Sequence, residues 1–130
     1  MPVIKVLKYD ADAQEAIAEI TTSLHETAIV SQVSLRVFCH MVSLPVISNK
    51  VSLFGLLVNN IASEDALQMP QKTNCGYFSY RLFAKVLDTK KRHVQLGDVD
   101  IELDCPLPKD IPDNSYISFD VVRLDLQQKT

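Results

Sequence analysis

Hydrophobic residues recur with two different periods along this chain of 130 residues, and each period predicts one kind of element. A period of three to four residues after Asp10 or Asp12, either of which suits an N-cap, predicts an amphipathic helix over about 11–26. A second helix is predicted over 49–62, where apolar residues follow a polar capping pair and form a wide face. We therefore expect two helices, of which the second is largely buried.

Strict alternation of apolar and polar residues predicts strands in the rest of the chain. Residues 33–43 and 78–86 alternate in this way. Two shorter alternating runs follow the polar turn at 88–92, which predicts an antiparallel meander. Near the end of the chain the apolar parity changes between Val121 and Val122. Such a change predicts a β-bulge at that point.

These elements together predict the α+β class. The expected architecture is a twisted, mostly antiparallel sheet of about five strands with two helices packed on one face. The length and the 47% hydrophobic content suit a single domain over 1–130. Residues 1–9 are predicted to form a flexible arm or an edge strand.

Charge and composition exclude several classes of function. The formal net charge of −3 gives no protein-wide attraction for nucleic acid or for anionic lipid. No apolar run reaches the roughly 18 residues of a membrane span, and the N-terminal segment lacks the apolar run of a signal peptide. Three glycines argue against glycine-rich phosphate loops. We expect an intracellular protein, in the cytoplasm or nucleus, with no cofactor and no transmembrane segment.

The densest basic cluster is Lys90, Lys91 and Arg92, at the tip of a predicted hairpin. Long cationic side chains there would suit the phosphates of RNA, of a ribonucleoprotein or of an anionic membrane surface. The alternative is a solvated turn that protects a hairpin edge from aggregation. The cluster is a candidate contact for an anionic partner.

A second candidate site is a stacking face formed by Tyr77, Arg81 and Phe83. An exposed aromatic pair beside an arginine suits single-stranded bases, and this favours an oligonucleotide-binding β-barrel module as an alternative function. The other aromatic residues of the segment point to the opposite face, where core packing explains them.

The acidic run Asp98, Asp100, Glu102 and Asp104 is explained by ordinary strand alternation, and no metal site is predicted.

No catalytic motif is recognisable, so we do not expect an enzyme. Cys39, Cys75 and Cys105 are widely spaced and are expected to be reduced. Cys39 and His40 are neighbours on a predicted strand and would point to opposite faces, which excludes them as a thiolate–imidazole pair. A small cysteine-dependent enzyme remains a further alternative.

The order of elements resembles the core of rhabdovirus-type matrix proteins. The resemblance is carried by the strand 33–43, the apolar helix 49–62, the aromatic-led segment Tyr77–Ala84, an acidic hairpin and the terminal segment Ser118–Leu124. It implies a scaffold that self-associates, contacts ribonucleoprotein and lies beneath a viral envelope. The chain lacks the lysine-rich arm and the proline-rich budding motifs of that family. We expect a non-catalytic structural or assembly protein that self-associates.

Overall fold

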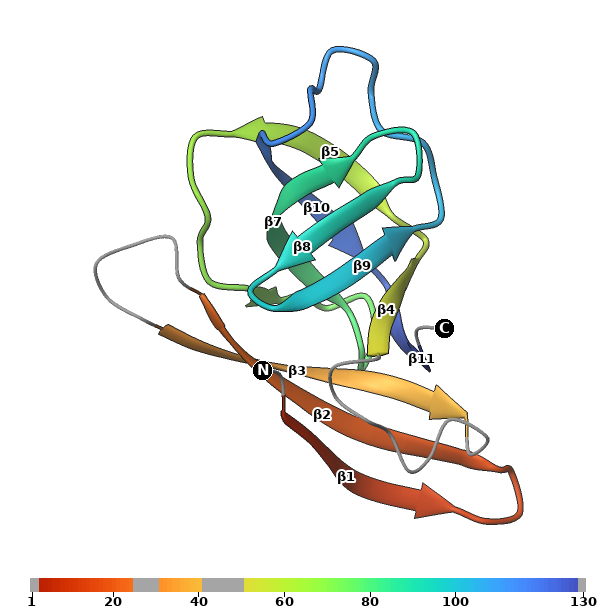
Figure 1. Ribbon diagram of the computed structural model, residues 1–130. Helices are drawn as coiled ribbons and strands as arrows, with labels where there is room; N and C mark the ends of the chain where they lie inside the picture. The colour runs from red at the N-terminus through yellow and green to blue at the C-terminus, as the bar shows by residue number, and fades with distance from the viewer. Residues whose placement is uncertain (1–2, 25–30, 41–50, 129–130) are drawn as a thin grey trace.

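The computed structural model describes residues 3–24, 31–40 and 51–128, and every regular element in these ranges is a β-strand (Figure 1). The predicted α+β class is therefore wrong, because the described residues form eleven strands in one large mixed sheet and contain no helix. The strands are β1 (Val3–Asp10), β2 (Glu15–Leu24), β3 (Ser31–His40), β4 (Val51–Leu56), β5 (Asn59–Glu64), β6 (Gln71–Lys72), β7 (Tyr80–Asp88), β8 (His93–Leu96), β9 (Val99–Leu103), β10 (Tyr116–Val121) and β11 (Arg123–Gln128).

The described part of the first predicted helix, residues 11–24, is the strand β2 together with the turn before it, and residues 25 and 26 lie outside the described residues. Asp10 does cap backbone N–H groups, as predicted, but it caps a hairpin turn: its Oδ1 accepts bonds from Asp12 (3.1 Å) and Ala13 (3.2 Å). Gln14 then adopts a positive φ of 55°, which turns the chain back along β1. Every second residue of β2 is buried, and Ile17 of the supposed helical stripe lies on the opposite, half-buried face.

The described part of the second predicted helix, residues 51–62, lies in a bent pair of strands, β4 and β5, and residues 49 and 50 lie outside the described residues. The bend lies at Leu57, whose φ of 55° no regular strand or right-handed helix permits. The carboxylate of Asp104 fixes it by accepting the N–H groups of Leu57 (2.6 Å) and Val58 (3.1 Å). The wide apolar face that suggested a buried helix belongs to strands whose alternate side chains point to two different faces.

Several strand predictions are confirmed. β3 and β7 begin within two residues of the predicted starts, and β7, β8 and β9 form the antiparallel meander. Residues 41–43 of the predicted strand 33–43 lie outside the described residues. The β-bulge predicted at Val121 and Val122 is instead the break between β10 and β11, where the Val122 N–H donates to the carbonyl of Leu56 (3.1 Å). Residues 3–10 form the edge strand that was one of the two predictions for this segment.

Strands β4, β5 and β7–β11 form a closed sheet, called here the closed body. β10, β7, β8 and β9 pair antiparallel in that order, and β9 pairs with β4 in parallel. β4 and its continuation β5 pair antiparallel with β11 and β10. β4 and β5 are one bent stretch of chain, and so are β10 and β11. The series of paired strands that starts at β4 therefore returns to the same stretch at β5, and the sheet closes on itself. The large side chains buried inside include Leu53, Leu82, Leu96, Ile101, Leu103, Ile117 and Phe119.

Strands β1, β2 and β3 form a second layer, called here the arm sheet, which lies below the closed body in Figure 1 with β1 farthest from it. β3 joins β11 in parallel at Phe38 and Cys39. The buried face of β2 and β3 shares one hydrophobic core with the closed body. At the junction, the Asp98 N–H donates to Thr22 Oγ1 (2.9 Å), and Gly97 lies so close that a Cβ there would come within 2.6 Å of the Ser23 carbonyl oxygen.

Candidate functional site

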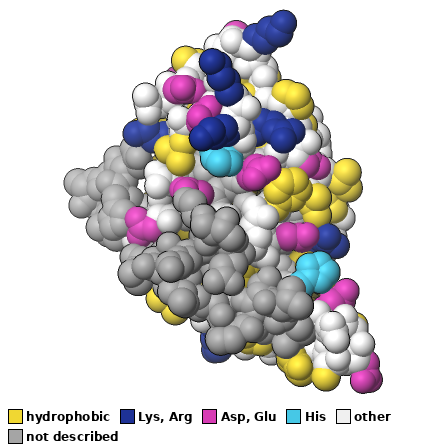
Figure 2. Space-filling model, turned by 45° about the vertical axis from the view of Figure 1, so that its right-hand side comes forward, with side chains coloured by type: hydrophobic (Ala, Val, Ile, Leu, Met, Phe, Trp, Pro, Cys, Tyr) yellow, Lys and Arg dark blue, Asp and Glu magenta, His cyan; other side chains and the backbone are white. Residues whose placement is uncertain are grey.

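The predicted basic cluster lies, as expected, at the turn between β7 and β8. Lys90 and Lys91 are exposed, and their N–H groups donate to Asp88 Oδ1 (3.0 and 3.2 Å). Arg92 is half-buried, and Asp113 on a neighbouring loop accepts the N–H of Thr89 (2.9 Å). Figure 2 shows basic and acidic side chains intermixed over the closed body on this side of the molecule. The carboxylates of Asp88 and Asp113 therefore lie at the same turn as these cations.

The structure does not bring the three residues of the predicted stacking face together. Phe83 is only 4% exposed, so its ring is not open to a base. Tyr77 lies in the turn before β7 and is 49% exposed, but its hydroxyl accepts a bond from Arg36 (2.6 Å). Arg81 lies with its guanidinium carbon 6.0 Å from the centre of the Phe83 ring.

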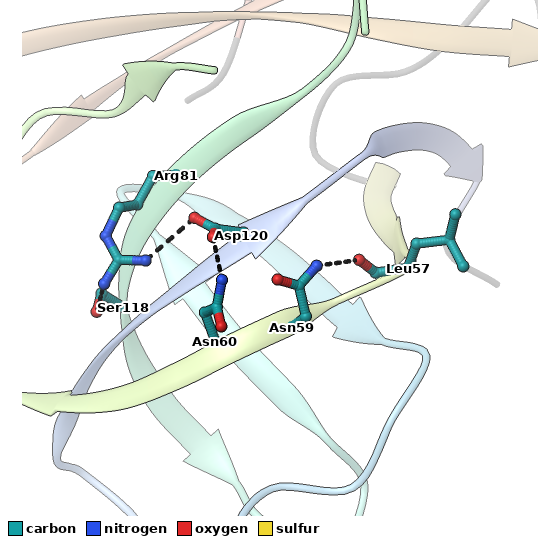
Figure 3. A network of polar contacts seen from close by, with 6 residues as sticks. All are labelled: Leu57, Asn59, Asn60, Arg81, Ser118 and Asp120. Atoms are coloured by element: carbon teal, nitrogen blue, oxygen red, sulfur yellow. Dashed lines mark hydrogen bonds and ion pairs between the residues drawn. The ribbon is translucent and has the colours of Figure 1, made fainter. Parts of the chain in front are cut away.

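Arg81 instead belongs to a polar network that joins three strands (Figure 3). Its guanidinium donates to Asp120 Oδ1 (3.0 Å) and to Ser118 Oγ (2.8 Å) on β10. Asn60 on β5 donates to the other oxygen of Asp120 (2.7 Å). These hydrogen bonds, first that from Asn60 and then that from Arg81, hold the pKa of Asp120 below its ordinary value against the opposing effect of burial. Arg81 is therefore placed to fasten β7 to β10.

The acidic run does not converge on a metal site. Asp104 caps the bend between β4 and β5, and Glu102 lies 3.8 Å from the imidazole of His93. Among the residues that the structure describes, no group of three or more His, Cys, Asp or Glu side chains could hold a metal ion.

The three cysteines have different environments. Cys39 is buried and its Sγ–H donates to the His40 carbonyl (3.3 Å), while the His40 side chain lies exposed on the other face. Burial raises the pKa of the Cys39 thiol. The pKa of Cys105 is also raised, by burial and by the neighbouring Asp104. A raised pKa disfavours the thiolate, which is the nucleophilic form.

An aromatic cluster that sequence reasoning missed joins the arm sheet to the turn before β7. Phe38 packs edge-on against Phe78, with ring centres 6.3 Å apart, and the Arg123 guanidinium carbon lies 4.7 Å from the Phe38 ring centre. Arg36 lies 5.2 Å from the Tyr77 ring centre. The alternation of Arg36, Phe38 and His40 was visible in the sequence, but Tyr77, Phe78 and Arg123, which contact Arg36 and Phe38, lie forty or more residues away. A cavity of about 230 Å³ adjoins the cluster, between Ile17, Phe38, Phe78 and the charged Lys8, Asp10 and Glu15.

β1 is exposed over nearly its whole length of eight residues. Within the described ranges its only strand neighbour is β2, so β1 presents one full row of backbone groups without a strand partner. Val3, Val6, Leu7 and Tyr9 are 65%, 43%, 39% and 55% exposed, and they make up half of the large hydrophobic residues found exposed in the described chain.

The pairing of β1 with β2 assigns the β1 side chains to two faces. Ile4, Val6 and Tyr9 stand opposite Ile20, Ala18 and Ala16, so they share the face of β2 that is buried against the closed body. Lys5, Lys8 and Asp10 stand opposite Glu19, Ile17 and Glu15 on the other, open face. A bulge between Val6 and Lys8 accommodates Leu7. Val6 and Tyr9 thus extend the apolar face beyond the area that the closed body covers.

Other unpaired edges in the described chain are shorter or more polar. β5 pairs only with β10, and its sequence Asn-Asn-Ile-Ala-Ser-Glu exposes mostly small or polar side chains. β6 has two residues. The β1 edge is therefore the candidate functional site that combines length, exposed backbone groups and apolar side chains.

Comparisons of the chain with models of protein families, with curated proteins and with solved structures find no match. No helix with the length and apolar character needed to cross a membrane occurs in the part of the chain that the structure describes.

Proposed function

We propose that this protein is a non-catalytic assembly protein that associates with further copies of itself through the edge of β1. The observation that carries the proposal is the combination of an eight-residue edge, which has no strand partner among the described residues, with exposed Val6 and Tyr9 on its apolar face. Addition of a strand to such an edge supplies backbone hydrogen bonds, while the side chains on the two faces supply specificity.

The same edge carries features that limit unspecific pairing. Lys5 and Lys8 project from it, and the bulge at Leu7 interrupts its regular ladder. Edge lysines and bulges are the means by which natural sheets avoid open-ended aggregation. They favour a defined complex of few copies over indefinite growth.

The proposal does not rest on the resemblance to matrix proteins. One of the elements that carried this resemblance, the apolar helix 49–62, consists of the two strands β4 and β5. The expected contacts with ribonucleoprotein or membrane therefore form no part of the proposal.

Sedimentation equilibrium over a wide range of protein concentration tests the proposed function. We expect wild-type protein to associate reversibly, and Val6→Lys to sediment as a monomer because it places a charge on the apolar strip. Met69→Lys is a matched control, since Met69 is 48% exposed on a loop of the closed body and Val6 is 43% exposed. Thermal melting should show both variants folded, because such surface changes usually alter stability by less than about 0.5 kcal/mol. Wild-type protein that stays monomeric, or Val6→Lys that associates like wild type, contradicts the proposal.

A second candidate function, binding of single-stranded nucleic acid, is supported by the aromatic cluster around Phe38 and Tyr77. Exposed rings beside arginines suit base stacking. It ranks second because Asp125 forms an ion pair with Arg123 (2.7 Å) and Glu19 stands opposite Arg36, so much of the local positive charge is neutralised. Fluorescence anisotropy with single-stranded RNA and DNA at low salt tests it: Tyr77→Ala should weaken binding, while Leu87→Ala, on β7 away from the cluster, should not. Absence of binding by the wild type removes this candidate.

A further inference from the structure

We infer that two copies pair their β1 strands antiparallel about a twofold axis, with Lys5 of each copy opposite Asp10 of the other and Val6 opposite Tyr9. This inference rests on the proposed association through β1 and specifies its partner, a second copy, and its register. In a twofold antiparallel pair, each contact occurs twice.

The two faces of β1 restrict the registers that two copies can adopt. Directly opposed residues of antiparallel strands project to the same face, and a shift by one residue exchanges the faces. Lys5, Lys8 and Asp10 lie on the open face, while Ile4, Val6 and Tyr9 lie on the apolar face, with the bulge at Leu7 between the two halves. Among the registers that pair residues on both sides of the bulge, two match the faces: one opposes Lys5 to Asp10, and the other opposes Lys5 to Lys8.

Charge decides between these two registers. The second register would place two lysine pairs in direct opposition, and like charges so placed destabilise a sheet. The first places two Lys5–Asp10 pairs there instead. It also sets Val6 against Tyr9 on the other face, and pairs of an aromatic with a β-branched residue are among the favourable cross-strand contacts.

The open face of the arm sheet supplies a second argument for this register. Asp10 stands directly opposite Glu15 on β2, so two carboxylates are neighbours at the edge. No ion pair joins either of them to a cation among the residues that the structure describes. At the other end of β1, Lys5, Glu19 and Arg36 alternate in sign across three strands. Pairing in the first register brings Lys5 of one copy beside the Asp10 of the other and extends the alternation by one strand.

A charge exchange tests the register. Lys5→Asp alone and Asp10→Lys alone should each weaken the self-association measured by sedimentation equilibrium by about tenfold to a hundredfold, because two attractive pairs become repulsive in each homodimer. An equimolar mixture of the two variants should regain wild-type association as a heterodimer, since every opposed pair is then attractive. Lys109→Asp, the same change on an exposed loop of the closed body, should leave association unchanged.

The outcomes separate this inference from the proposed function. Asp10 also caps the turn before β2, but loss of a cap or of folding in Asp10→Lys would not be repaired by adding the other variant. Restored association in the mixture therefore supports the register specifically. If Val6→Lys abolishes association but the mixture is no tighter than the single variants, the copies pair through β1 in another register and the inference is overturned. If Val6→Lys does not change self-association, both the proposed function and this inference are contradicted.

Discussion

The closed body and the arm sheet are built from the same kind of strand, but their backbone hydrogen bonds end differently. In the closed body, β4, β9, β8, β7 and β10 each have a strand on both sides, because the chain returns to its own first strand. The arm sheet runs outward from β11 through β3 and β2 and ends at β1. Apart from the outer edge of β5, the strands of the body find their partners within one copy. Among the described residues, the arm sheet instead leaves the whole outer row of β1 donors and acceptors without a strand partner, and a second copy can supply one.

The largest effects should come from matched truncations of the core in the two regions. Leu35→Ala in the arm sheet and Leu103→Ala in the closed body each remove a leucine side chain that is at most 2% exposed. Each should lower the free energy of unfolding by about 2–5 kcal/mol. Because both leucines belong to one core cluster, we expect a single cooperative transition for both variants in chemical denaturation followed by circular dichroism. Two separate transitions in Leu35→Ala would show that the arm sheet unfolds independently.

A change at the junction of the two regions should have the next largest effect. Gly97→Ala puts a methyl group 2.6 Å from the Ser23 carbonyl oxygen and gives an alanine a positive φ of 59°. We expect a loss of about 3 kcal/mol in thermal or denaturant unfolding from the clash and the strained backbone together. Gly76→Ala shows the cost of a positive φ without a clash, since its φ is 153° and its new Cβ would meet no atom within 4 Å. A loss in Gly97→Ala of less than about 1 kcal/mol would contradict the close contact with β2.

The polar network of the closed body should give a smaller, pH-dependent effect. Asp120→Asn should cost about 1–2 kcal/mol at neutral pH, because it weakens hydrogen bonds to a charged group. The pKa of Asp120 is lowered in the folded state, so its stabilising contribution is complete above roughly pH 4, the pKa of an unfolded aspartate, and disappears as the pH falls through the folded value. The difference in stability between wild type and variant should therefore shrink in acid. Asp110→Asn, the same change on an exposed loop outside the network, is the control for the substitution itself.

Removal of the basic tip should have the smallest effect. Replacing Lys90, Lys91 and Arg92 together by alanine should change stability by less than about 0.5 kcal/mol in thermal melting. The carboxylates of Asp88 and Asp113 lie at the same turn and offset its positive charge. We therefore also expect the triple variant to bind RNA or anionic vesicles as the wild type does, at two salt concentrations. A fall in binding together with a weaker salt dependence would instead identify the tip as a phosphate contact.

The contrast between the two regions also explains which elements the sequence could predict. The meander of β7, β8 and β9 was predictable because buried residues alternate with polar ones and short turn sequences separate the strands. In β2, by contrast, the buried face includes Ala16, Ala18 and Thr22, which do not stand out as hydrophobic. The larger hydrophobic residues Ile17, Ile20 and Leu24 are spaced by three and four residues, and this spacing matched a helical period by coincidence.

The other features that the sequence could not predict depend on contacts between residues far apart in the chain. The bend between β4 and β5 depends on Asp104, which lies 46 residues beyond Val58, so no local signal marks it. Likewise, residues 3–10 could be recognised as an edge strand or arm, but the register that sorts Lys5 and Val6 onto opposite faces depends on pairing with β2. The sequence therefore predicted the strand of the candidate site but not which of its side chains share a face.

Closure of the body has a consequence for how the chain folds. The β1–β2 hairpin and the β7–β8–β9 meander join neighbouring stretches and need only short loops to form. The pair that closes the body brings Val51 against Gln128, so nearly the whole second half of the chain must be gathered first. Pairings of such long sequence separation lose the most loop entropy and form slowly. We therefore expect closure to be the late, rate-limiting step, reached after the arm hairpin has already formed.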